Sequence, residues 1–186
     1  TYEAVYTRIT EEDVSTLKEL DDFSRVGEYY MLAVEPAKQG YNASYIYCDE
    51  ETMYIARDQM KLLEGRLPQK EDEVAVSRYF LSNYGADAGI GEKVMLNSES
   101  FHGEYTVTGI LEGYKEKEVN GSSILLSKEA LKGWSGYDPA DYRAYVHFKN
   151  EQQMDETELT ARSREIAKEY QLEMPIMNLS YMKFYK

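Results

Sequence analysis

In the middle of the chain stand three runs: LEGRLP at residues 63–68, DEVAVS at residues 72–77 and YTVTGI at residues 105–110. Gly65 and Pro68 are typical of a chain turn, because glycine tolerates left-handed backbone and proline lacks the N–H that regular pairing needs. The second run predicts a strand over residues 73–76, after which Ser77 can cap a short helix that stops at Gly85. The third run is rich in β-branched and aromatic residues and predicts another strand.

The residues that follow this helix predict a turn and several further strands. Glycines between Gly85 and Gly91 favour a turn. Strands are expected at residues 94–96, 105–111 and 123–126. A short helix capped by Ser127 and ended by Gly133 completes this part. The middle of the chain is therefore expected to be mostly strand, with short helices.

The first residues predict a strand followed by a helix. Residues 2–9 combine aromatic and β-branched types, as strands do. Thr10 and Asp13 have the spacing of a capping box. The helix after them would bury four apolar residues at helical spacing: Val14, Leu17, Leu20 and Phe23. Gly27 is expected to end that helix.

Two strands and an ambiguous stretch come next. The strands are expected at residues 28–35 and 43–48, with a turn over residues 36–40 between them. Residues 50–64 fit either one helix or a short strand near Met60, and the pattern does not choose between the two.

The last third repeats the strand–helix–strand order of the first. Residues 142–148 predict a strand, and the apolar spacing over residues 152–170 predicts a helix. Residues 174–179 predict a closing strand, with Pro175 near its start, where a missing N–H is tolerated. Two βαβ units commonly place their helices on one face of a shared sheet.

The expected architecture is therefore α+β with two lobes. Residues 1–60 and 138–186 would form a porter-like lobe from the two βαβ units at the chain ends. Residues 61–137 would form an inserted, mostly-β lobe with short helices. A length of 186 residues is sufficient for such a core without disulfides or metals.

Composition excludes some functions. The formal net charge of −13 repels phosphate backbones and anionic lipid headgroups, so no nucleic-acid partner is expected. A cationic partner such as a basic peptide would be compatible with that charge. The single cysteine, Cys48, cannot form an internal disulfide and is expected to be a buried apolar residue of a strand.

The chain has no run approaching the roughly 18 apolar residues that a membrane helix needs. It begins without Met, directly in strand-like sequence, and ends abruptly on Phe184, Tyr185 and Lys186. We expect from this that it is a water-soluble part of a larger membrane protein.

A search for catalytic chemistry yields no candidate residues. His147 lies in a predicted strand, His102 lies in a polar loop, and no G-x-S-x-G sequence accompanies them. The glycines at Gly89 and Gly91 do not form a P-loop, because Glu92 precedes Lys93 and no Ser or Thr follows. We therefore expect no enzyme activity and no cofactor, and identify no catalytic, cofactor-binding or metal-ligating residues.

Acidic residues and tyrosines gather in several places. Carboxylates cluster at residues 11–13, 21–22, 49–51 and 71–73, without the spacing of a calcium-binding loop. Eight of the 18 tyrosines fall in the first third, and six of these lie close together between residues 29 and 54: Tyr29, Tyr30, Tyr41, Tyr45, Tyr47 and Tyr54. Tyrosine suits half-buried strands, protein interfaces and sugar stacking alike, so their role stays open, and the binding residues stay unknown.

The three runs quoted above, with Leu81, Gly85, Gly91 and Val94 between them, resemble a known pattern. They are similar to the series EGR-P, (D/N)E(I/V)(V/A)(V/L)S, L, G, G-x-x-V and (Y/F)-x-V-x-G-I in extracytoplasmic domains of MacB/FtsX-like ABC transporter permeases. The resemblance covers about residues 60–111 at the level of motifs, and the order of predicted elements extends it to the whole chain.

The resemblance implies a non-catalytic domain on the extracytoplasmic face of the bacterial cell membrane, anchored by flanking transmembrane helices. It would transmit conformational change, or contact a cargo such as an antimicrobial peptide, a lipoprotein or a toxin. Its partners would be the rest of its permease, a second permease copy and a separate or fused ATPase that this domain does not contact. An extracellular sensor domain and a secreted carbohydrate-binding module are the alternatives.

Overall fold

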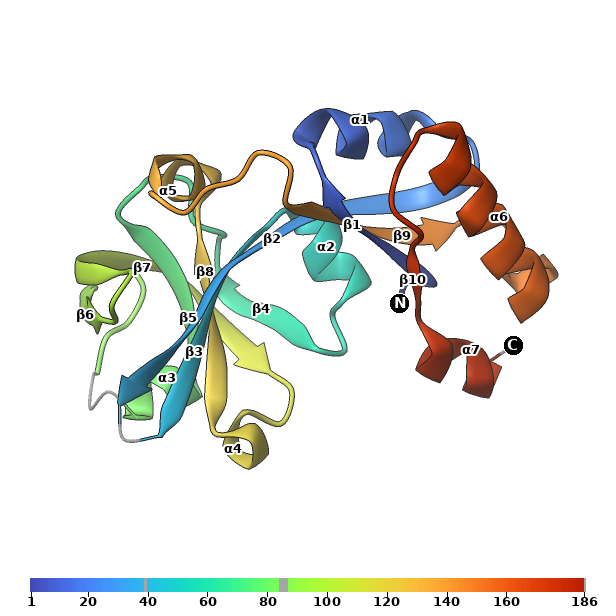
Figure 1. Ribbon diagram of the computed structural model, residues 1–186. Coiled ribbons are helices and arrows are strands. Elements are labelled where there is room, and N and C mark those ends of the chain that lie inside the picture. The colour runs from blue at the N-terminus through green and yellow to red at the C-terminus, as the bar shows by residue number, and fades with distance from the viewer. Residues whose placement is uncertain (39, 84–86, 186) are drawn as a thin grey trace. The chain divides into compact units, whose positions relative to one another are not determined.

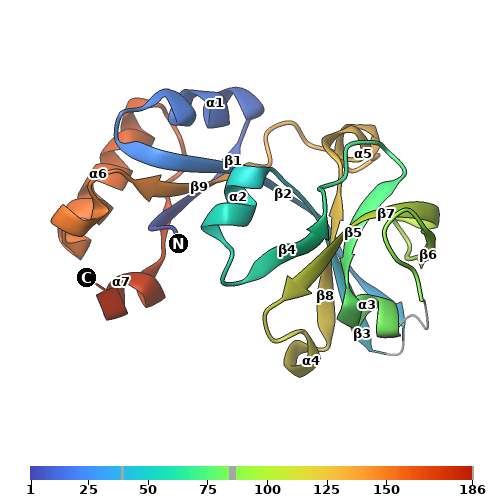
Figure 2. The same cartoon turned by 180° about the vertical axis from the view of Figure 1, so that it is seen from behind.

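The computed structural model describes residues 1–38, 40–83 and 87–185, and the chain divides into two compact units (Figures 1 and 2). The terminal unit contains residues 1–30, 49–56 and 138–186. The inserted unit contains residues 31–48 and 57–137. The expected α+β class is confirmed, with the ends of the chain in one unit.

The terminal unit is built on a four-stranded sheet in the order β10-β1-β9-β2. Its elements are β1 (Ala4–Ile9), α1 (Glu11–Glu19), the first part of β2 (Phe23–Lys38), β9 (Tyr142–Phe148), α6 (Glu156–Glu169) and β10 (Ile176–Met177). Strand β9 is antiparallel to both β1 and β2, and β10 is antiparallel to β1. Two βαβ units are thereby interleaved, since β9 lies between β1 and β2 while β1 lies between β9 and β10.

Both long helices of this unit begin at a capping residue. Thr10 accepts a hydrogen bond from the Asp13 amide and the Asp13 carboxylate accepts one from the Thr10 amide, which confirms the capping box. Asp155 caps α6 through the Glu158 amide at 2.8 Å, so this helix begins later than expected. A short 3-10 turn, Glu151–Gln153, precedes it.

The core of this unit lies between the sheet and these two helices. Alternate residues of β9 are buried: Tyr142, Ala144, Val146 and Phe148. Tyr6 is fully buried, and its hydroxyl donates to the main-chain oxygen of Ser163 in α6 at 2.8 Å. Fully burying each large apolar side chain contributes about 1.5–3 kcal/mol to the free energy of unfolding. Packing of the helices on the sheet is therefore the main source of stability in this unit.

Gly27 does not end the first helix, which is a correction to the sequence prediction. Helix α1 ends at Glu19, and Gly27 lies within β2. Helix α2 (Glu50–Ile55) packs over it so closely that a Cβ on Gly27 would lie 2.3 Å from Thr52 Oγ1. The glycine is therefore required by a close helix–strand approach, which a helical period cannot reveal.

The ambiguous and closing stretches also differ from expectation. Residues 50–64 form both alternatives in succession, helix α2 and then strand β4 (Met60–Gly65). The closing strand is only the two residues of β10, because Asn178 begins a helix: its main-chain oxygen accepts the Met182 amide at 3.1 Å. A further helix, α7 (Leu179–Tyr185), follows and was not predicted.

The inserted unit is a mixed sheet in the order β2-β3-β8-β5-β7-β4, with β6 pairing along β7. Besides the end of β2 and β4, its elements are β3 (Tyr41–Cys48), β5 (Glu73–Ser77), α3 (Arg78–Asn83), β6 (Lys93–Asn97), β7 (His102–Gly113), α4 (Glu116–Val119), β8 (Gly121–Leu126) and α5 (Lys128–Gly133). The pairs β3–β8 and β5–β7 are parallel. Residues 31–48 and 57–60, expected in the porter-like lobe, belong here instead, because β3 pairs with β8 and β4 pairs with β7.

The short helices of this unit are capped by serine, as the sequence predicts. Ser77 Oγ accepts the Phe80 amide at 3.0 Å, and Ser127 Oγ accepts the Ala130 amide at 3.0 Å. Phe80 in α3 is fully buried. The expected helix stop at Gly85 lies outside the described residues.

The run LEGRLP lies against the run YTVTGI, main chain to main chain. Gly65 has a φ of 76°, and a Cβ on it would lie 2.1 Å from the Thr108 carbonyl oxygen. The Arg66 amide donates to Thr108 O at 2.9 Å, and Thr108 Oγ1 donates back to Arg66 O at 3.0 Å. The two runs, which are far apart in the sequence, are therefore in direct main-chain contact. Residue 65 must be glycine because a Cβ would not fit there.

Candidate functional site

An ion pair within the inserted unit closes the loop between the first two runs of the motif. Arg66 Nη1 and Nη2 donate to the two carboxylate oxygens of Glu73 at 3.0 and 2.7 Å. Glu73 Oε1 also accepts the amides of Gln69 and Lys70, each at 2.9 Å. The Arg66 hydrogen bonds and these amides lower the pKa of Glu73 to about 2, although burial opposes this.

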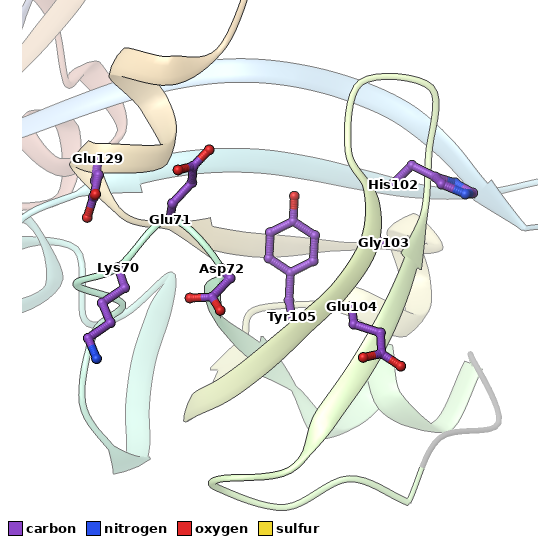
Figure 3. Close-up of a pocket in the computed structure, with 8 residues that line it drawn as sticks. All are labelled: Lys70, Glu71, Asp72, His102, Gly103, Glu104, Tyr105 and Glu129. Carbon is purple, nitrogen blue, oxygen red and sulfur yellow. The ribbon is translucent and has the colours of Figure 1, made fainter.

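This closed loop contributes one wall of a hollow (Figure 3). The hollow is lined by Lys70, Glu71 and Asp72 of the loop, by residues 102–105 at the start of β7, and by Glu129 of α5. The Asp72 main-chain oxygen accepts the Thr106 amide at 2.8 Å, so the wall and β7 are held together by main-chain hydrogen bonding.

The phenol of Tyr105 stands in the middle of these side chains. Figure 3 shows Glu71 and Asp72 on one side of its ring, and His102 and Glu104 on the other. Burial raises the pKa of Tyr105, and the nearby carboxylates Glu71 and Asp72 raise it further. The hydroxyl is therefore un-ionised at neutral pH.

The hollow is acidic and open. Its carboxylates belong to Glu71, Asp72, Glu104 and Glu129, and all four residues are exposed. Glu104 lies 3.6 Å from Lys93, in an ion pair that solvent screens. Such a surface attracts cationic groups, but within the part of the chain that the structure describes no group of three His, Cys, Asp or Glu residues could hold a metal ion.

The two histidines do not combine into a catalytic cluster within one unit. His102 lines the hollow of the inserted unit, whereas His147 belongs to the terminal unit. His147 Nδ1 lies 2.8 Å from the carboxylate of Glu3, whose other oxygen accepts the Phe148 amide at 2.7 Å. His147 lies in strand β9, as the sequence predicts, and its partner Glu3 is fully buried.

The tyrosines of the first third divide between core and surface. Of the six between residues 29 and 54, Tyr30, Tyr41 and Tyr45 are buried. Tyr54 is 49% exposed, and the Arg25 guanidinium lies 3.8 Å from the centre of its ring. Cys48 is buried, as expected.

Sequence reasoning identified no residue of the hollow as functional. The acidic run at residues 71–73 and the strand starting at Tyr105 were the available signals. Glu129 and Glu104 have no local sequence signal, because only the folded chain brings them next to the loop.

Among the helices of the described residues, none has both the length and the apolar composition of a membrane-spanning helix.

Comparison with protein-family models finds no match, and no curated protein matches the sequence. Solved structures do match. The extracellular domain of the noncanonic ABC-type transporter YknZ from Gram-positive bacteria superposes with a TM-score of 0.64 at 14% identity, over 95% of this chain and 99% of that domain.

Two further structures show the same fold. The periplasmic region of MacB from Actinobacillus actinomycetemcomitans matches with a TM-score of 0.62 at 11% identity, over 94% of this chain and 86% of that one. A domain described as part of a permease from Porphyromonas gingivalis matches with a TM-score of 0.59 at 14% identity, over 90% and 82%. The fold of this chain is therefore that of extracytoplasmic permease domains, as the resemblance implied.

Proposed function

We propose that this chain is the extracytoplasmic domain of an ABC transporter permease and has no catalytic activity of its own. The observation that carries the proposal is the extent of the match to the YknZ domain, 95% of this chain and 99% of that one. A likeness that includes both units is stronger support than a likeness of either alone, because single α+β units recur among unrelated functions.

The terminal unit is the porter-like lobe of this proposal. Both ends of the chain lie in it, and Figure 1 shows the N and C labels on this unit. The Asn178 side-chain amide donates to the Tyr2 carbonyl at 2.9 Å, so the first strand and the closing segment lie together. Transmembrane helices joined at these ends would place the terminal unit next to the membrane.

The finer role is to transmit conformational change, to contact cargo, or both. Its partners would be the rest of its own permease and a second permease copy, with an ATPase on the cytoplasmic side that this domain does not contact. The domain would lie on the extracytoplasmic face of a bacterial cell membrane, where a peptide or protein cargo is accessible to it. The net charge of −13 and the acidic hollow would favour cationic over anionic cargo.

Labelling of a single cysteine in the full-length protein tests the location. In a Cys48→Ala background, Glu129→Cys would place an exposed thiol on α5. We expect a membrane-impermeant maleimide to label it in intact cells as completely as in lysed cells. The Cys48→Ala protein without the Glu129→Cys substitution is the control for background labelling. Labelling that needs lysis would reject the extracytoplasmic location.

A second experiment separates the transporter from a sensor. If the domain belongs to a permease, the full-length protein should co-purify with an ATPase, and deletion of residues 1–186 should abolish transport-linked ATP hydrolysis without abolishing assembly. Co-purification with a histidine kinase instead would contradict the proposal.

A further inference from the structure

The segment between β7 and β8 in the inserted unit combines exposure with backbone strain. It contains the one-turn helix α4, which projects at the ends of β7 and β8 in both views (Figures 1 and 2). Lys115 and Asn120 on either side of α4 have φ values of 54° and 50°, in the left-handed region. Lys115 incurs a Cβ penalty in this region, and such strain often marks segments that switch between conformations, whereas asparagine tolerates the region and can end a helix in this way.

One side chain of this segment points into the unit. Glu116 Oε1 accepts the Gly113 amide at 2.9 Å. Glu116 Oε2 accepts the hydroxyl of Ser77 at 2.6 Å and also the hydroxyl of Ser122. Ser77 and Ser122 are 2% and 5% exposed, so the carboxylate meets donors that belong to the interior of the unit.

The donors around this carboxylate are oriented by a further residue. The buried Tyr41 hydroxyl donates to Ser122 Oγ, which leaves the Ser122 proton free to be directed at Glu116. The Ser77 and Ser122 oxygens are 3.2 Å apart and converge on the same carboxylate oxygen. The Gly113 amide and the hydroxyls of Ser77 and Ser122 all donate, and none of them needs a proton from the bound group. Such a set suits a carboxylate better than an alcohol or an amide, which would bring protons of its own.

Close approach of the segment depends on glycine. A Cβ on Gly113 would lie 2.8 Å from Glu116 Cγ, so a larger residue would push the carboxylate away from its donors. The rest of the segment is poorly buried, with Tyr114 at 57% and Val119 at 65% exposure. Helix α4 has no side-chain cap at its start. Segments with few buried contacts open at lower free energy than the strands beside them.

We propose that Ser77, Ser122, Tyr41 and the Gly113 amide form a carboxylate-binding pocket, which Glu116 occupies in this structure, and that α4 is a strap that swings away when a carboxylate from another molecule takes its place. The pocket supplies hydrogen-bond donors for a carboxylate, and the strained backbone at Lys115 supplies the hinge. This goes beyond the proposed transport role and does not depend on it.

Occupancy of an emptied pocket gives the first test. In the Glu116→Ala variant of the 186-residue chain, acetate should bind where the glutamate carboxylate was. At ten times its dissociation constant, acetate should raise the melting temperature of this variant by about 3–6 °C. Chloride at equal ionic strength and neutral acetamide, which has a similar size, are the solution controls.

Further variants make the result specific. The unsubstituted chain should show no difference between acetate and chloride, because Glu116 fills the pocket. Glu116→Ala combined with Ser122→Ala should lose most of the acetate shift. Equal melting temperatures of Glu116→Ala in acetate and in chloride would overturn the pocket.

Two larger acids identify the source of the carboxylate. N-acetylglycine presents a main-chain carboxylate, as a peptide C-terminus does, and N-acetylaspartate amide presents a side-chain carboxylate. A larger shift with the first would assign the pocket to a chain end, and a larger shift with the second to an acidic side chain. An acetate shift without either would restrict the ligand to small free carboxylates.

The strap is tested without any substitution, so the proposal can fail even if the variants do not fold. In hydrogen–deuterium exchange of the unsubstituted chain, the Val119 amide, which donates to Lys115 O at 3.0 Å, should exchange at least about tenfold faster than the amides of β8, because the strap opens without unfolding the sheet. Equal protection in α4 and β8 would overturn the strap.

Discussion

The carboxylates that bind arginine or histidine in the terminal unit contrast with two loop carboxylates of the inserted unit. In the terminal unit, charged partners come from distant parts of the chain: Arg162 of α6 binds both oxygens of Asp22 at 2.7 and 2.9 Å, and His147 binds Glu3. In the inserted unit, Glu73 and Glu116 accept main-chain amides a few residues away and so fold loops upon themselves.

This difference follows from the helices. Helices α1 and α6 bury apolar faces on a shared sheet, and this packing holds them in place. Ion pairs such as Asp22–Arg162 then only help to fix the orientation of a helix on the sheet. Within its described residues, the inserted unit has helices of four to six residues, too short to be stable by themselves. Its loops therefore depend on carboxylates, and the candidate hollow and the Glu116 pocket both occur there.

The largest expected effect concerns the core of the inserted unit. Phe80→Ala removes a fully buried ring and should lower the free energy of unfolding by about 3–5 kcal/mol. Trp134, the single tryptophan, lies in this unit and reports its unfolding by fluorescence in urea. Ile166→Ala in α6 is the matched variant of the terminal unit. If it moved the Trp134 transition as much as Phe80→Ala does, the units would not be independent.

The next effect tests the close approach at Gly27. Gly27→Ala would place a methyl group against Thr52 of α2 and should cost about 1–3 kcal/mol of unfolding free energy, because backbone as well as side chain must move. Gly133→Ala is the control, since its nearest neighbour is 3.8 Å away. Urea denaturation followed by circular dichroism measures both, and an unchanged Gly27→Ala variant would contradict the packing of α2.

The loop carboxylate Glu73 should show a smaller and pH-dependent effect. Glu73→Gln should cost about 1–2 kcal/mol at pH 7, since Arg66 remains partly solvated. The pKa of Glu73 is lowered from 4.5 to about 2 by folding, so its contribution is complete above pH 4.5 and is lost as the pH falls towards 2.

Denaturant unfolding at pH 7 and at pH 3 measures the difference between this variant and the unsubstituted chain. That difference should shrink at the lower pH. Glu64→Gln, which removes an exposed partner of Arg78 at 3.6 Å, should change stability by less than about 0.5 kcal/mol. A difference that grows on acidification would contradict the lowered pKa of Glu73.

The smallest effect is a gain in stability at the end of α6. Gln171 has a φ of 58°, and the Leu172 amide closes the helix end on the Ala167 oxygen at 2.8 Å. Gln171→Gly should stabilise the chain by about 0.5–1 kcal/mol, because glycine adopts this conformation without a Cβ penalty. Gln152→Gly, at a position without positive φ, should bring no gain in thermal unfolding.

Prediction from sequence succeeded where the signal is local. The capping box of Thr10 and Asp13, the serine caps at Ser77 and Ser127, and the alternation over residues 142–148 each depend on residues within one turn or one strand. It failed at Gly27 and at residues 31–48, because a glycine under a helix and a strand pairing in parallel with β8 are decided by segments far away in the chain.

The candidate sites show the same limit. The acidic run at residues 71–73 was visible, but the hollow needs Tyr105 and Glu129, and the carboxylate pocket needs Tyr41, Ser77 and Ser122 around Glu116. No sequence spacing predicts that these residues come together, because hydrogen bonding between side chains of different strands depends on the order of the strands in the sheet. Sheet order follows from long-range pairing, which the sequence of each strand specifies only weakly.

The sequence by itself determined the α+β class and the strand–helix–strand order of the two ends. It also contains the motif by which the chain resembles extracytoplasmic permease domains. These depend on caps, turns and apolar periods, which act between neighbours in the chain. Only the tertiary structure decided which strands interleave, that Glu73 and Glu116 act as loop anchors, and where carboxylates and hydroxyls converge. The physical reason is that such groups act over a few ångströms, and folding alone brings distant segments within that range.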